Sequence, residues 1–132
     1  MLGLPEDVLA LIEEAVAGGV TLFGEPDTDS DVKRDGDKMY SYGYSVLSPL
    51  PSVHQGLVAV REQLPAVTAP LLLFTSREDH TISNESSTYL ASRVSGSVTH
   101  VWLEDSWHVA TVDADAPRIE ADTLRFLQEV FS

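Results

Sequence analysis

The sequence contains no cysteine, so disulfide bonds, thiolate nucleophiles and thiolate metal sites are all excluded. It also has no long apolar run, because no window approaches the roughly 18 residues of a membrane span. The segment from Met1 to Asp7 has neither the basic start nor the apolar stretch of a signal peptide. We therefore expect a cytoplasmic protein without a membrane span.

Basic residues are scarce. The chain has 8 Lys and Arg against 21 Asp and Glu, a formal net charge of -13. Such a charge repels phosphate backbones and anionic membrane surfaces. Nucleic acid is therefore not expected as a partner.

The length of 132 residues and the hydrophobic content of 43% are sufficient for one core.

The first part of the chain contains two stretches with apolar residues at helical spacing, Pro5 to Ala17 and Val53 to Leu64. Each predicts an amphipathic helix, and the two should share a core. Between them, residues 25–38 are rich in Asp, Ser, Gly and Lys, which predicts a solvated acidic loop. Alternating tyrosines then predict a short, irregular strand near Tyr40 to Tyr44.

The second part predicts the order strand, helix, strand, helix. The apolar runs Leu71 to Thr75 and Val98 to Leu103 are the strands, and the first is apolar on both faces, as in a strand covered on both sides. Ser83 or Asn84 can cap the helix between them, and Pro117 can begin the last helix. This order predicts an α/β fold with parallel strands joined by a right-handed crossover.

Asp79 and His108 each lie shortly after one of these strands. Open parallel sheets place their chemistry at the carboxyl ends of strands. A histidine that acts as a general base needs a carboxylate on its other ring nitrogen, so the two residues form a candidate catalytic pair. The alternative is that Asp79 accepts backbone hydrogen bonds in a turn and that His108 fills a loop.

Two segments resemble a known family. Pro70 to Ile82, PLLLFTSREDHTI, resembles the α/β-hydrolase strand and loop that deliver the acid of a catalytic triad. Glu104 to Asp113, EDSWHVATVD, resembles the histidine loop of carboxylesterases and monoacylglycerol lipases. The resemblance implies that Asp79 orients His108, that His108 activates a serine in a G-x-S-x-G turn, that the substrate is a small carboxylic ester, and that no cofactor takes part.

The resemblance is strongest over residues 70–132, which we expect to form the C-terminal unit of a partial α/β-hydrolase. Residues 1–69 look like the helical cap, or lid, that these enzymes insert before that unit. The cap shapes the acyl pocket in the family. The apolar residues of the first helix could therefore line a pocket, or they could belong to the core.

The nucleophile that the family requires is missing from these residues. No G-x-S-x-G occurs, and the nearest similar segment, Ser95-Gly-Ser97, precedes a strand instead of following one. We therefore expect the chain to be the C-terminal portion of a longer esterase or lipase, inactive by itself, with Met1 as a true start being the alternative. An isolated chain should self-associate through the open edge of its first strand. A second hypothesis is a non-catalytic binding or assembly module derived from such a hydrolase.

No metal site is predicted. Asp27, Asp29 and Asp31 imitate the opening of an EF-hand loop, but Val32 stands where glycine is needed and Lys38 where a bidentate glutamate is needed. An acidic loop without a bound ion is the better interpretation.

Other polar residues near the candidate pair have structural interpretations. We expect His80 to be an exposed turn residue or to lie at the rim of the site, and Trp107 to anchor its loop or to cover the pocket. Asp105 is a rival for the acid role, although it lies on the loop of His108 itself. Asp113 and Asp115 suit the start of the last helix, where negative charge is stabilised.

Overall fold

The computed structural model describes residues 5–24, 31–34 and 44–132. These residues fall into two compact units. The larger unit contains residues 31–34 and 64–132, and the smaller unit contains residues 5–24 and 44–63.

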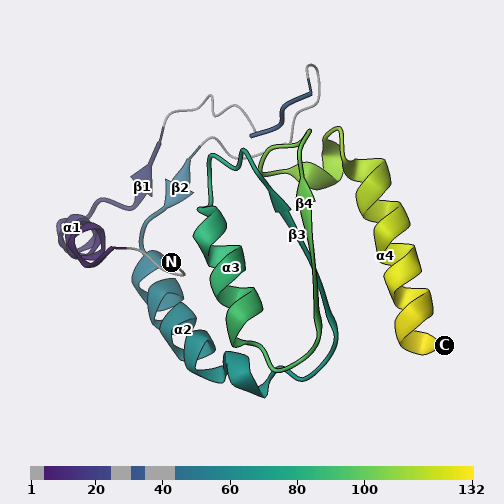
Figure 1. Cartoon of the computed structure of the whole chain (residues 1–132). Helices are drawn as coiled ribbons and strands as arrows, with labels where there is room; N and C mark the ends of the chain where they lie inside the picture. The colour runs from purple at the N-terminus through teal and green to yellow at the C-terminus, as the bar shows by residue number, and fades with distance from the viewer. Residues whose placement is uncertain (1–4, 25–30, 35–43) are drawn as a thin grey trace. The chain divides into compact units, whose positions relative to one another are not determined.

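The larger unit is built on two parallel strands, β3 (Leu71–Ser76) and β4 (Val98–Leu103). Leu71 lies opposite Val98, and Ser76 lies opposite Leu103. The crossover helix α3 (Asn84–Arg93) and the last helix α4 (Ala116–Phe131) lie on opposite sides of the strands (Figure 1). Single 3-10 turns, Leu64–Ala66 and Ala110–Val112, precede β3 and α4. The predicted strand, helix, strand, helix unit and its parallel pairing are confirmed.

Local chemistry explains where these elements begin and end. Ser83 caps α3, and its Oγ accepts the backbone N–H of Glu85 at 3.3 Å. Pro117 lies in the first turn of α4, where a missing N–H costs nothing. Gly96, between α3 and β4, donates its N–H to Val67 at 2.9 Å, and a Cβ there would overlap the carbonyl group of Ala69. Glycine is thus required here by the close approach of another backbone segment.

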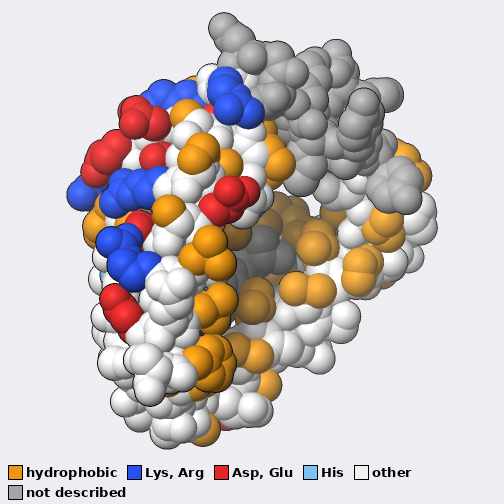
Figure 2. Space-filling model, turned by 90° about the vertical axis from the view of Figure 1, so that its right-hand side faces the viewer, with side chains coloured by type: hydrophobic (Ala, Val, Ile, Leu, Met, Phe, Trp, Pro, Cys, Tyr) orange, Lys and Arg blue, Asp and Glu red, His pale blue; other side chains and the backbone are white. Residues whose placement is uncertain are grey.

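The core of the larger unit is thin. Leu103 is only 1% exposed, but no residue of α4 is buried. Leu124 is 62% exposed and Phe131 82%. Figure 2 shows hydrophobic side chains in a column beside charged ones over α4. Exposed apolar surface of this kind is typical of a face that packs against further protein.

The smaller unit contains α1 (Glu6–Ala17) and α2 (Leu50–Gln63), which contact each other. Two short strands, β1 (Leu22–Phe23) and β2 (Ser45–Val46), pair antiparallel. Both predicted helices are confirmed, whereas the tyrosine strand and most of the acidic loop lie outside the described residues. The assignment of residues 1–69 to a cap stays a prediction. Among the described helices, none has the length and apolar character needed to cross a membrane.

Candidate active site

The two loops that follow β3 and β4 lie at the same end of the sheet (Figure 1). We call residues 77–83 the acid loop and residues 104–113 the histidine loop. They bring Asp79 and His108 together: the histidine Nδ1 lies 3.0 Å from Asp79 Oδ2. Parallel pairing of the strands produces this contact, because it places both carboxyl ends side by side.

The carboxylate of Asp79 is held by its own loop as well. Oδ1 accepts the N–H groups of Thr81 at 2.9 Å and Ile82 at 2.7 Å, and the side chain is 13% exposed. Burial by itself raises the pKa of Asp79, but the hydrogen bonds from His108, Ile82 and Thr81 outweigh it and hold the pKa below its ordinary value. Asp79 is therefore both a turn residue and the partner of the histidine.

His108 directs its ring over a cavity. The side chain is 34% exposed, and among the described residues no hydrogen bond engages its Nε2. Because a neutral imidazole donates at one nitrogen and accepts at the other, a carboxylate on Nδ1 leaves Nε2 as the acceptor. The geometry can therefore present a proton-accepting nitrogen to a group in the cavity.

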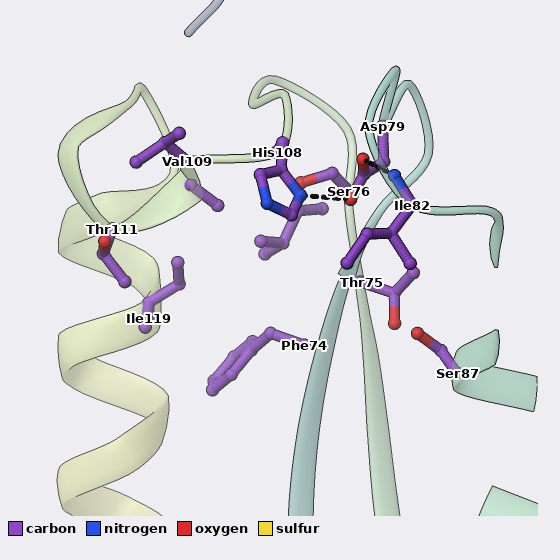
Figure 3. A pocket seen from close by; sticks show the side chains of 12 residues that line it. Phe74, Thr75, Ser76, Asp79, Ile82, Ser87, His108, Val109, Thr111 and Ile119 are labelled. Atoms are coloured by element: carbon purple, nitrogen blue, oxygen red, sulfur yellow. Dashed lines mark hydrogen bonds and ion pairs between the residues drawn. The ribbon is translucent and has the colours of Figure 1, made fainter. Parts of the chain in front are cut away.

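The cavity has a volume of about 440 Å³. His108 and Asp79 lie at its border, and most of its other lining is apolar, including Phe74, Ile82, Val109 and Ile119 (Figure 3). A pocket that combines apolar lining with a small number of polar side chains is typical of a small-molecule site.

Asp31 joins the two loops, a role that the sequence did not reveal. Its Oδ1 lies 2.7 Å from His80 Nδ1, and its Oδ2 accepts the backbone N–H groups of His80 at 3.1 Å and His108 at 3.2 Å. Burial raises the pKa of Asp31, but these hydrogen bonds lower it further than burial raises it.

No group of three potential metal ligands occurs among the described residues.

Asp113 lies just before α4, where its carbonyl oxygen accepts the N–H of Ala116, and its carboxylate anchors the histidine loop. Its carboxylate is 0% exposed and accepts four backbone N–H groups. The donors are Lys33 at 2.7 Å, Arg34 at 3.0 Å, Trp107 at 3.0 Å and Ala114 at 2.8 Å. Asp115 does lie at the N-cap of α4, although its Oδ2 accepts the N–H of Asp105 and makes no side-chain cap.

The remaining candidates have structural surroundings. His80 is exposed and lies edge-on to Trp107, with ring centroids 4.8 Å apart. Trp107 also donates its Nε1–H to Glu78 at 3.3 Å, so it connects the two loops. The side chain of Asp105 is exposed, and the contact with His108 is made by Asp79. Ser97 directly precedes β4, as expected for a residue that is not a nucleophile.

The parallel strands, the crossover helix and the carboxylate and histidine at their ends resemble part of an α/β-hydrolase of the lipase and esterase type. Comparison with known proteins supports this class. No protein-family model matches the chain. It is 29% identical over 118 residues to a thermostable monoacylglycerol lipase from Bacillus sp. (strain H-257), covering 85% of this chain and 47% of that protein. It is 23% identical over 95 residues to a carboxylesterase from Bacillus subtilis (strain 168), covering 71% and 39%.

A solved structure gives the same result. The chain matches a structure from work on LipS and LipT, two metagenome-derived lipolytic enzymes, with a TM-score of 0.74 and 28% identity. The match covers 80% of this chain and 43% of that one. The predicted relationship and the partial α/β-hydrolase fold are confirmed. The chain spans less than half the length of each of these relatives.

Proposed function

We propose that this chain supplies the acid and the histidine of a serine carboxylic-ester hydrolase, an esterase or lipase. The observation that carries the proposal is the 3.0 Å contact between Asp79 and His108 beside an apolar cavity. The similarity to a monoacylglycerol lipase and a carboxylesterase supports the same chemistry.

In the proposed reaction, His108 Nε2 accepts the proton of a serine hydroxyl as the serine attacks the ester carbonyl. The same nitrogen then donates that proton to the leaving alcohol. Asp79 holds the Nδ1–H and stabilises the imidazolium that forms between these steps. In this proposal the serine and the oxyanion donors belong to a part of the enzyme beyond these 132 residues, since the sequence contains no G-x-S-x-G.

The cavity suits the acyl portion of the ester. Phe74 and Ile119 supply apolar surface below the histidine ring (Figure 3). The volume of about 440 Å³ lies within the range of roughly 300–1,000 Å³ that small-molecule pockets occupy. A neutral carboxylic ester with an apolar acyl chain is therefore the proposed substrate, and the mechanism requires no cofactor.

The test uses the native polypeptide that contains these residues. It is first identified by capture from its source cells, and it is then expressed as wild type and as His108→Ala. With p-nitrophenyl butyrate as substrate, we expect kcat/KM to fall by roughly 10³-fold or more, because removal of the general base of a triad costs several orders of magnitude. His54→Ala on α2 is the matched control and should retain activity. Near-normal hydrolysis by His108→Ala contradicts the proposal.

The exposed apolar side chains of α4 also suit a second function, a non-catalytic binding or assembly module. The mass of the native polypeptide separates the two proposals. A species of about twice this size or more, as full hydrolase domains have, favours the enzyme. A species of 14.4 kDa would consist of these 132 residues alone, which contain no G-x-S-x-G, and would favour the module.

A further inference from the structure

The segment of residues 31–34 is bound to both loops of the candidate site, although it lies far from them in the sequence. Its contacts to His80 and His108 span 49 and 77 positions. We propose that Asp31 is a positioning residue that fixes the acid loop against the histidine loop and thereby sets the contact between Asp79 and His108. Its effect on catalysis rests on the proposed function, whereas its effect on geometry does not.

The contacts of Asp31 are made at the positions that matter for the pair. The carboxylate binds the backbone of His108 itself and that of His80, the residue after Asp79. One side chain thus fixes the main chain beside each member of the pair. Other links between the loops run from Trp107 Nε1 to Glu78 and from Arg77 Nε to Glu104, and both are exposed contacts between side chains.

A carboxylate suits this position because three donors converge on it. Two backbone N–H groups and the Nδ1–H of His80 share two oxygens, and an ionised carboxylate only accepts. An amide keeps one accepting oxygen and turns an NH₂ group toward the remaining donors. Asp31→Asn should therefore retain part of the bridge, and Asp31→Ala none of it.

The segment is held in place independently of the Asp31 side chain. The N–H groups of Lys33 and Arg34 bind the buried carboxylate of Asp113, and the carbonyl oxygen of Asp31 accepts the N–H of Val109 at 3.1 Å. Replacement of the side chain should therefore leave residues 31–34 docked on the histidine loop. The change then removes the bonds of the Asp31 carboxylate to His80 and His108, while the segment keeps its other contacts.

The first test is nuclear magnetic resonance on the 132-residue chain. This measurement does not depend on catalysis, so the nucleophile is not needed. In the wild type, neutral His108 should carry its proton on Nδ1, because Asp79 accepts there. In Asp31→Ala, we expect the amides of His80 and His108 to exchange with solvent at least roughly tenfold faster, since each loses its acceptor. The ring of His108 should shift toward the Nε2–H tautomer, and Asp31→Asn should lie between the two.

Asp105→Asn is the matched control, since it removes an exposed carboxylate from the histidine loop itself. It should leave both the exchange rates and the tautomer unchanged. A His108 tautomer that is the same in wild type and Asp31→Ala overturns the positioning role, even if the amides exchange faster. A wild-type His108 that already carries its proton on Nε2 also overturns the positioning role of Asp31.

A kinetic test in the native polypeptide separates this proposal from the proposed function. Asp31→Asn should lower kcat roughly tenfold while KM changes little, because the pair is misaligned and the cavity remains. Full activity in Asp31→Asn combined with inactivity in His108→Ala overturns the role of Asp31 alone. Full activity in both variants overturns the proposed function as well.

Discussion

The backbone N–H of Lys33 lies 2.7 Å from Oδ2 of Asp113, across 80 positions of the sequence. The same carboxylate accepts three further backbone N–H groups and is fully buried. A short segment from the first part of the chain is therefore tied to the histidine loop by a buried carboxylate that four backbone N–H groups stabilise. The four donors make this carboxylate difficult to replace.

We expect Asp113→Asn to lower the free energy of unfolding by about 2–4 kcal/mol, because an amide leaves buried donors without an acceptor. Urea denaturation followed by tryptophan fluorescence measures the effect. The exposed change Asp105→Asn should alter stability by less than about 0.5 kcal/mol. Equal stability of the two variants would contradict the role assigned to Asp113.

Stability should also fall at acid pH. The hydrogen bonds to Asp31, Asp79 and Asp113 hold the pKa of each below its ordinary value of 3.8. A carboxylate with a lowered pKa stabilises the fold above the pKa of the unfolded chain, and this contribution is lost as the pH falls through the folded value. Unfolding free energies measured from pH 6 downward should therefore decrease below about pH 4. Asp113→Asn should show a shallower decrease, and a slope equal to that of the wild type would count against this explanation.

Asp79→Asn should uncouple the histidine from its acceptor without changing the cavity. In the native polypeptide, we expect kcat to fall by roughly 10³–10⁴-fold, as in other triads that lose the orienting carboxylate. KM for p-nitrophenyl butyrate should change little, since Asp79 lies at the border of the cavity and the apolar lining remains. Asp105→Asn serves as the control, and the assignment fails if that variant is the inactive one.

Replacement of Gly96 and of Gly56 by alanine should change the free energy of unfolding in opposite directions. At Gly96 a Cβ would lie 2.8 Å from the carbonyl carbon of Ala69 and 2.9 Å from the oxygen of Thr68, so the backbone must move. We expect Gly96→Ala to lower the unfolding free energy by about 1–3 kcal/mol. Gly56 lies within α2 with open space around it, so Gly56→Ala should raise stability by about 0.5–1 kcal/mol. Thermal melts of both variants check the pair, and a stabilising Gly96→Ala would show that the close approach does not exist.

The isolated chain should self-associate. Among the described residues β3 pairs only with β4, and an unpaired strand edge invites further pairing. Light scattering over a range of concentrations should show a mean mass that rises above that of the monomer. A monodisperse monomer at moderate concentration would contradict this expectation.

Local sequence predicted most of the larger unit. The strand predicted from Leu71 to Thr75 extends one residue further, to Ser76, and the strand from Val98 to Leu103 has the predicted bounds. Ser83 caps α3 as expected. These features depend on neighbours within a few residues, through periodicity, capping and turn chemistry, so a single sequence contains their causes.

The sequence by itself placed Asp79 and His108 after two strands that are consecutive in the chain, which made them a candidate pair, and the resemblance to the hydrolase family supported that pair. The structure shows that the two strands are paired neighbours. Only the tertiary structure decided which other carboxylates hold that pair. Asp31 stood in an acidic stretch beside similar residues, and the position of Asp113 in the sequence favoured the start of a helix. Their partners are backbone N–H groups as far as 80 positions away. Every residue except proline carries such a group, so no sequence pattern marks the partner, and only the folded chain brings donor and acceptor together.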